Sequence, residues 1–184
     1  GVQTCALPIW SGGTPLSTKK HFYGGNIPFL GISDISNSNG IILRTEKSIN
    51  DEGLQNSSSW IVPKGSISLA MYASVGKIAV LNIDLATSQA FYNMVFNDDS
   101  LRDFVYYRLI KAYDFNEWSR LISTGTQDNL NAQKVKDFVI ELPNATKEIE
   151  YLGMFFNNLS NFITLHQHKC EKIGRAHVWT PVTA

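Results

Sequence analysis

The last part of the chain carries a helical pattern of apolar side chains. From residue 149 to residue 170, these side chains recur at alternating steps of three and four residues. Such a heptad seam, about three repeats long, is typical of a helix that packs lengthwise against another helix. It predicts a helix over residues 144–172, about 44 Å long, which cannot bury its seam on a domain beside it and therefore needs a second helix. The seam consists of Ile149, Leu152, Phe156, Leu159, Ile163, His166 and Cys170.

Residues 66–83 carry the strongest β pattern. Alternation between residues 66 and 72 places Ile67, Leu69 and Met71 on one face of a strand, and residues 77–83 are almost all apolar. The residues between the two runs, 74–76, predict a β-hairpin connection. Weaker patterns predict strands at 27–35, 41–44, 89–96 and 137–142, a type I turn at 62–65, and a helix from Asp99 or Ser100 to about Ala112.

Together these elements predict an α+β protein, with a β-rich domain and a few helices at 11–143 and the long coiled-coil-type helix at 144–172. Both ends of the chain lie outside this pattern. When residues 1–9 are translated back into DNA, the opposite strand of one codon choice encodes residues 173–180. One stretch of DNA and its inverted copy thus account for both ends, which resemble a translated sequencing adapter. We therefore expect residues 1–10 and 173–184 to be non-native.

Charge and cysteine content narrow the possible functions. Lys and Arg total 16, Asp and Glu total 16, and the pI is about 7.1, which excludes a polybasic binder that acts through phosphate neutralisation alone. No apolar run approaches the roughly 20 residues that cross a bilayer, so no membrane partner is expected. Cys170 is the one cysteine between the two unusual ends, which indicates no disulfide framework and a reducing, cytoplasmic setting.

The sequence shows few marks of enzyme chemistry. It lacks GxGxxG and GxxxxGK[ST], the glycine-rich patterns that bind dinucleotides and nucleotides, and the GxSxG of a nucleophilic serine. His166, His168 and Cys170 suggest metal ligands, but His166 and Cys170 belong to the seam, and two ligands do not complete a tetrahedral site. We predict no catalytic residue, no metal site and no cofactor.

Four loops are rich in side chains that form hydrogen bonds and poor in apolar ones. They cover residues 14–23, 33–39, 72–77 and 123–131. Asn and Gln can pair with adenine, and Lys with guanine or phosphate, so these loops are candidates for contact with nucleic acid. Because loops are polar in most proteins, composition alone does not distinguish DNA contact from an ordinary solvated surface.

The order and spacing of several motifs resemble one protein family, the specificity subunits of type I restriction-modification systems. Phe155–Leu159 and the segment 163–169 are similar to the spacer helix of these subunits. The other motifs resemble their target-recognition domain, and they are SGGTP at 11–15, YGGNIPF at 23–29, VPKG at 62–65, ASVGK at 73–77, TSQ at 87–89, STGTQ at 123–127 and VIELP at 139–143.

This resemblance implies a non-catalytic reader of DNA. Such subunits carry two recognition domains, each for one half of a bipartite site, separated by two helices that pair as an antiparallel coiled coil. The resemblance therefore supplies the second helix that the seam requires. It also implies three partners, namely double-stranded DNA, methyltransferase (modification) subunits and restriction subunits with motor and nuclease activity, which can provide phosphate contacts that a neutral chain lacks. Gly153 and Cys170 depart from the pattern, because better helix or seam residues are expected there.

Loop position and side-chain type give the expected DNA contacts within this resemblance. The candidate phosphate contacts are Lys19, Lys20 and Lys77. The candidate contacts to base edges or grooves are Tyr23, Ser33, Asp34, Ser74, Gln127 and Asn129.

Two other interpretations stay open at this point. A β-rich protein-interaction module on a coiled-coil stalk explains the seam and the neutral charge, but not the run of motifs. The recognition part of a fused methyltransferase-nuclease would have its catalytic motifs outside this chain. The flanking gene sequence distinguishes them, because a second recognition domain supports a specificity subunit and a methyltransferase domain supports the fusion.

Overall fold

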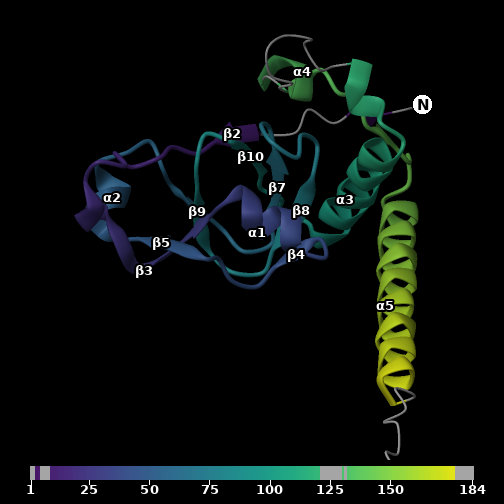
Figure 1. Cartoon of the computed structure of the whole chain (residues 1–184). Coiled ribbons are helices and arrows are strands. Elements are labelled where there is room, and N and C mark those ends of the chain that lie inside the picture. The colour runs from purple at the N-terminus through teal and green to yellow at the C-terminus, as the bar shows by residue number, and fades with distance from the viewer. Residues whose placement is uncertain (1–2, 5–8, 121–129, 131, 177–184) are drawn as a thin grey trace, which may run out of the picture.

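The computed structural model describes residues 3–4, 9–120, 130 and 132–176. It shows a head built from β-sheets and short helices, with one long helix, α5 (Thr146–Ala176), at its side. In Figure 1 the first part of α5 lies beside α3 (Asp99–Asp114), while the rest extends beyond the head. This arrangement confirms the predicted α+β class and the long C-terminal helix.

The largest sheet has five strands and contains the predicted hairpin. Strands β7 and β8 pair antiparallel, with Ile67 opposite Val80 and Leu69 opposite Ile78. Edge strand β4 joins β8 in parallel, and no local pattern announces such a long-range pairing. The strand order is β2 (Ile9–Ser11), β10 (Phe91–Met94), β7 (Ile67–Ala70), β8 (Ile78–Leu81) and β4 (Ile41–Ile42).

Two smaller sheets complete the head. In the four-stranded sheet, β3 pairs antiparallel with β5 and parallel with β9. The order of that sheet is β5 (Lys47–Ile49), β3 (Tyr23–Leu30), β9 (Leu85–Thr87) and β6 (Ile61–Val62). The two-stranded sheet joins β1 (Gln3–Thr4) to β11 (Glu141–Leu142). The N-terminal segment that we expect to be non-native thus contributes β1 and part of β2.

Helix α3 begins close to where the sequence predicts it. The Asp98 carboxylate accepts hydrogen bonds from the backbone N–H groups of Ser100, at 2.8 Å, and Leu101, at 3.4 Å. Asp98 is therefore the N-cap, and the helix continues to Asp114. The remaining helices are short, and they are η1 (Lys20–Phe22), α1 (Ile32–Asn37), α2 (Asp51–Gln55), η2 (Glu117–Arg120) and α4 (Ala132–Lys136).

Strand β7 divides the apolar core into two clusters. Ile67, Leu69 and Met71 belong to the cluster that includes α3, as their shared face predicts. The opposite face is buried as well, because Ala70 belongs to the second cluster, with Phe91 and other residues between the two larger sheets. The residues of the neighbouring strand β8 divide between the same two clusters, which explains why its apolar run is nearly continuous.

A buried polar junction connects the two larger sheets. The Ser68 hydroxyl donates to Asn93 Oδ1 at 2.6 Å, and Asn93 Nδ2 donates to Thr87 Oγ1 at 2.8 Å. The backbone oxygen of Thr87 accepts from the Ser59 hydroxyl at 3.2 Å and from the Gly13 N–H at 3.0 Å. These groups satisfy one another inside the head, which fixes the relative position of the two sheets.

The strand predicted at 27–35 is wrong in its second half. Strand β3 ends at Leu30, and Ile32–Asn37 forms α1. The Asp34 carboxylate accepts a hydrogen bond from the Gly31 N–H at 2.8 Å, which stabilises the start of this helix. The apolar residues of the segment satisfy either pattern, and the local carboxylate contact favours the helix.

The turn and the last predicted strand also differ from expectation. The Ser66 N–H donates to the Pro63 carbonyl at 3.2 Å, and Gly65 has a φ of +88°. Glycine therefore occupies the third position, where type II geometry requires a positive φ, and the predicted type I turn at 62–65 is wrong. The strand expected at 137–142 is reduced to Glu141–Leu142.

Candidate nucleic-acid interface

Helix α1 and the tip of the β7–β8 hairpin form one polar rim on the head, which we call the α1–hairpin rim (residues 32–37 and 72–77). The hydroxyl groups of Ser36 and Ser74 lie 3.0 Å apart, and Lys77 Nζ donates to the Ser36 carbonyl at 2.7 Å. The rim thus brings together two loops that are about 40 residues apart in the sequence. Of the predicted site residues, it includes Ser33, Asp34, Ser74 and Lys77.

Two of these side chains hold the rim in place. The Asp34 carboxylate accepts from the backbone N–H groups of Gly31, at 2.8 Å, and Glu46, at 2.9 Å. Both of its oxygens are therefore engaged within the head, which makes Asp34 a support for α1. The Ser33 hydroxyl donates to Glu46 Oε2 at 3.1 Å and stays exposed.

The hairpin tip is a strained but well-anchored turn. Ala73 and Ser74 have φ values of +38° and +62°, a region that costs a non-glycine residue about 1–3 kcal/mol. Gly76 has a φ of +84°, and a β-carbon there would lie 2.6 Å from Trp118 Cδ1, so only glycine fits against this buried indole. Tyr72, which is 45% exposed, lies at the base of the tip.

Tyr72 was not among the predicted contacts, because its position at the end of an alternating run favours a strand residue. The structure ends β7 at Ala70 and leaves Tyr72 exposed. The length of the loop between the two strands could have identified Tyr72. In a hairpin with a two-residue loop, Tyr72 would have remained paired within the strand.

The other predicted contacts lie at the opposite end of β3. Lys19 and Lys20 are exposed beside η1, and Lys19 Nζ lies 5.1 Å from the ring centroid of Phe22. The Tyr23 hydroxyl donates to the Pro15 carbonyl at 2.7 Å. At about 3.3 Å per residue, the eight residues of β3 span roughly 23 Å, and this strand separates the group from α1. The structure thus yields two separate groups.

Gln127 and Asn129 lie outside the described residues. Leu130, which follows them, donates its backbone N–H to the Met71 carbonyl at 3.3 Å. Trp118, which precedes them, packs on Gly76. Both flanks of this loop therefore contact the hairpin of the α1–hairpin rim.

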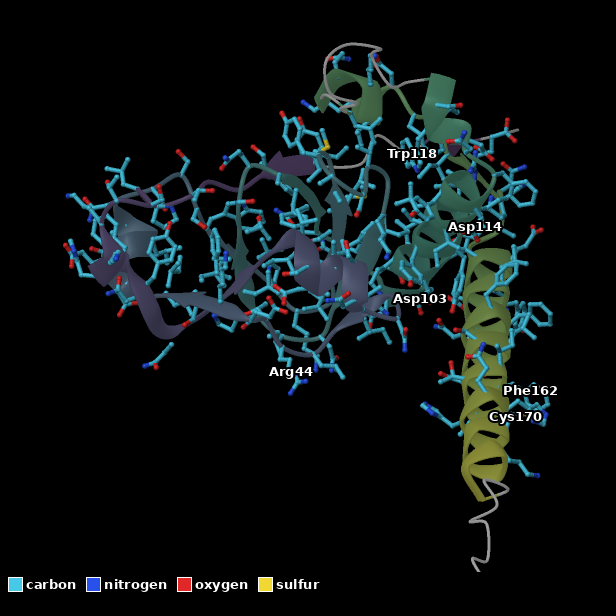
Figure 2. The ribbon with its side chains drawn as sticks, viewed as in Figure 1. Arg44, Asp103, Asp114, Trp118, Phe162 and Cys170 are labelled. Carbon is cyan, nitrogen blue, oxygen red and sulfur yellow. The ribbon has the colours of Figure 1, made fainter. Side chains whose placement is uncertain are left out.

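Metal-binding capacity is low in the part of the chain that the structure describes. No three His, Cys, Asp or Glu side chains there are grouped so that they could hold a metal ion. Arg44, labelled in Figure 2 at the edge of the head, is an exposed cation a few residues beyond the rim. No helix within the described ranges is long and apolar enough to span a membrane.

Comparison with known proteins decides the family. A family model, the type I restriction modification DNA specificity domain, matches residues 7–175. The chain belongs to this family. The match confirms the resemblance that the motifs indicate, and it extends over both the head and α5.

Two curated relatives of the chain are both named specificity subunits of type I restriction enzymes. The chain is 32% identical over 170 residues to the type I restriction enzyme MjaIX specificity subunit of Methanocaldococcus jannaschii, covering 90% of the chain and 39% of that protein. It is 27% identical over 161 residues to the HindI specificity subunit of Haemophilus influenzae, covering 84% of the chain and 35% of that protein. The chain therefore spans well under half the length of either relative.

Solved structures share the fold of the specificity domain. The HsdS subunit from Thermoanaerobacter tengcongensis superposes with a TM-score of 0.60 at 18% identity, over 97% of the chain and 40% of that subunit. A chain from a structure on complex assembly and conformational transition of the type I R-M system gives a TM-score of 0.67 at 18% identity, over 95% of the chain and 42% of that chain. None of these comparisons supports the interaction module or the fused methyltransferase-nuclease.

The seam of the specificity domain is covered in its first part only. Ile149 and Leu152 are half-buried, and the ring of Phe156 lies 5.2 Å from that of Tyr107 on α3. The expectation that the head covers none of the seam is therefore wrong for its first turns. Beyond Phe156 the seam is exposed, with 43% exposure at Leu159 and 48% at Ile163, and Figure 2 shows Phe162 on the side of α5 away from the head.

Proposed function

We propose that the chain reads one half of a bipartite DNA site as part of a type I specificity subunit. The observation that carries this proposal is the family match over residues 7–175, supported by two relatives that are named specificity subunits. Those relatives are more than twice as long as the chain, which leaves room in them for a second recognition domain of similar size. We assign residues 11–143 to the recognition domain and 144–172 to the spacer helix.

The α1–hairpin rim is the part of the head that we assign to base contacts. It offers the hydroxyl groups of Ser33, Ser74 and Tyr72, which can donate to and accept from base edges. Gln127 and Asn129 belong to the loop whose flanks contact the same hairpin. Lys77 is engaged with Ser36, so we assign it the dual role of holding the rim and placing a positive charge there.

Lys19 and Lys20 would contact phosphates at the other end of β3. The length of β3, roughly 23 Å, corresponds to about seven base pairs, at about 3.4 Å per base pair along one strand. Both groups can therefore contact a single duplex that runs along β3. In such an arrangement the lysines position the domain, and the rim reads the sequence.

The partners would be double-stranded DNA, modification (methyltransferase) subunits and restriction subunits, in the cytoplasm. We propose that catalysis belongs to those subunits and that the chain contributes no catalytic residue, metal or cofactor. The exposed part of the seam on α5, from Leu159 to Cys170, would pair with a second spacer helix. Residues 1–10 and 173–184 would play no part, as non-native ends.

The test is selection of bound DNA from a pool of random duplexes. The purified chain is mixed with the pool at low salt, bound duplexes are separated by gel electrophoresis, and bound and unbound pools are sequenced. We expect a short enriched motif and binding that weakens as salt rises. Identical sequence composition in the two pools would contradict the proposal. A control with His166 and Ile163 replaced by Ser, outside the head, should enrich the same motif.

A further inference from the structure

A hydrogen-bonded network joins α5 to α3 where the long helix leaves the head. The Tyr107 hydroxyl donates to Asn157 Oδ1 at 2.9 Å, and Asn157 Nδ2 donates to Asp103 Oδ2 at 2.5 Å. The other oxygen of Asp103 accepts from Arg102, at 2.8 Å from Nε and 2.7 Å from Nη2. Asn157 thus connects two side chains of α3 at once, through its amide oxygen and its amide nitrogen.

The side chains of this network are largely shielded from solvent, so its hydrogen bonds restrict how α3 and α5 cross. The Asp103 and Arg102 side chains are only 17% and 16% exposed. Burial raises the pKa of Tyr107, a side-chain hydrogen bond with Ser160 partly opposes that rise, and the charge of Asp103 adds a smaller one. Figure 2 shows Asp103 on α3, close to α5. In such partly dry surroundings an unmatched carboxylate or amide costs more than at an exposed surface, so the pairing of donors and acceptors restricts how the helices cross.

Gly153, one turn before Asn157, allows the close approach that the network needs. A β-carbon at residue 153 would lie 3.3 Å from both Asp103 Cβ and the Ser100 carbonyl. Glycine inside a helix normally costs about 0.5–1 kcal/mol relative to alanine. Here it lets the two backbones approach, which explains the residue that departs from the expected helix pattern.

Past Asn157 the side chains of α5 become exposed, and Tyr107 of α3 also forms a side-chain hydrogen bond with Ser160. A groove of about 840 Å³ separates the segment around β4 from Ser160, Asn161 and Thr164 on the helix. All residues from 158 to 170 are exposed. The orientation of this exposed part is therefore set by the contacts from Gly153 to Ser160, with Asn157 at their centre.

We propose that Asn157 is a positioning residue, which fixes the angle between α5 and the head by bridging Asp103 and Tyr107. Cys170 lies 17 residues beyond Gly153, about 26 Å along a helix, so a change of about 10° moves it by about 4–5 Å. On DNA this displacement exceeds one base pair, which is about 3.4 Å. If the proposed function holds, the pairing at Asn157 therefore determines the half-site spacing that the complete subunit accepts.

The test measures the angle directly, without DNA. Spin labels are placed at Cys170 and at Gln55→Cys on α2, in the full chain with Cys5→Ser, and the distance distribution is recorded by double electron–electron resonance. Excess unlabelled chain suppresses distances between molecules. We expect one narrow distribution for the parent and for the control Asn158→Asp, which makes the same substitution at the next, exposed residue.

Asn157→Asp should broaden the distribution or shift it by several ångströms, because two carboxylates then face each other. The double variant Asp103→Asn with Asn157→Asp exchanges the two groups, keeps every donor opposite an acceptor, and should restore the parent distribution. A parent-like distribution in Asn157→Asp, or a double variant that is not restored, would overturn the proposal. If circular dichroism shows that Asn157→Asp does not fold, Tyr107→Phe replaces it, and a parent-like distribution in that variant overturns the proposal instead. Because no DNA is present, these results are independent of whether the head reads a half-site.

Discussion

Gly12 packs so closely on Thr87 that a β-carbon at residue 12 would lie 1.9 Å from the Thr87 carbonyl oxygen. The adjacent Gly13 donates its N–H to that same oxygen at 3.0 Å, and the Thr14 hydroxyl donates to Gln89 Oε1 at 2.7 Å. Two motifs of the family, at 11–15 and 87–89, are therefore two sides of one contact. Their packing and hydrogen bonds join the two sheets, which explains why these residues occur at these positions.

The first prediction concerns this contact. Gly12→Ala should destabilise the head by about 3 kcal/mol or more, because backbone atoms of β9 cannot move aside without disturbing the polar junction. Gly24→Ala serves as the contrast, since nothing lies within 4 Å of a β-carbon there and only its φ of +82° opposes the change. We expect a loss of about 1 kcal/mol for that variant. Urea unfolding of both variants measures the difference, and equal losses would contradict the clash.

The second prediction concerns stability at high pH. Burial, with a smaller effect of Tyr107, raises the pKa of Tyr106 to about 12. Above pH 10 the unfolded chain loses this proton while the folded chain keeps it, so the free energy of unfolding should fall as the pH rises from about 10 to about 12. The contribution is at most about 1.4 kcal/mol per pH unit.

Tyr106→Phe tests this assignment. The variant loses the hydrogen bond from the Tyr106 hydroxyl to the Gly40 carbonyl, at 3.3 Å, at every pH. Its stability between pH 10 and 12 should fall less steeply than that of the parent, as measured by urea unfolding at several pH values. If the free energy of unfolding falls equally steeply with pH in both proteins, groups other than Tyr106 cause the fall.

The third prediction concerns DNA affinity. Lys19→Ala should weaken binding almost equally for all sequences, because a phosphate contact carries no sequence information. The slope of log affinity against log salt should become shallower by about 1. Lys111→Ala, which removes an exposed lysine of α3, is the control and should change neither quantity. If Lys19→Ala leaves the slope of log affinity against log salt unchanged, η1 is not part of the DNA-binding surface.

The fourth prediction concerns self-association. Without a second spacer helix, the exposed seam should pair with the seam of another copy at high concentration. Leu159→Asp should abolish this association in light scattering at two concentrations. Leu165→Asp is the matched control, because Leu165 is 69% exposed but lies off the seam. If both variants associate like the parent, the seam is not the contact surface.

Strong local periodicity was the most reliable guide to the fold. The hairpin of β7 and β8, the start of α3 and α5 up to residue 172 follow from alternation, capping chemistry and the heptad pattern. Helix α5 continues to Ala176, four residues into the end that we expect to be non-native. The parallel pairings of β3 with β9 and of β4 with β8 could not be predicted, because each joins segments whose separation is set by tertiary packing. Helix α1 was missed because one carboxylate contact, from Asp34 to Gly31, decides a segment of six residues.

The candidate site could be predicted by loop but not by side chain. Polar composition selected the loops that form the α1–hairpin rim, whereas the side-chain contacts that engage Asp34, Tyr23 and Lys77 depend on distant residues. Gly153 likewise could not be explained from the neighbouring sequence. Its small size is unfavourable in an isolated helix and is explained by Asp103, which lies 50 residues earlier in the chain.

The anchoring of the hairpin tip has a calorimetric consequence. Gly76 against Trp118, and Lys77 on Ser36, hold Ala73 and Ser74 in their strained turn in the free protein. A loop that is already ordered loses little conformational freedom when the protein binds DNA. The heat-capacity change of DNA binding should therefore be small, as it is when two rigid surfaces associate. The rigid hairpin tip would then not change its conformation to fit a duplex of the wrong sequence.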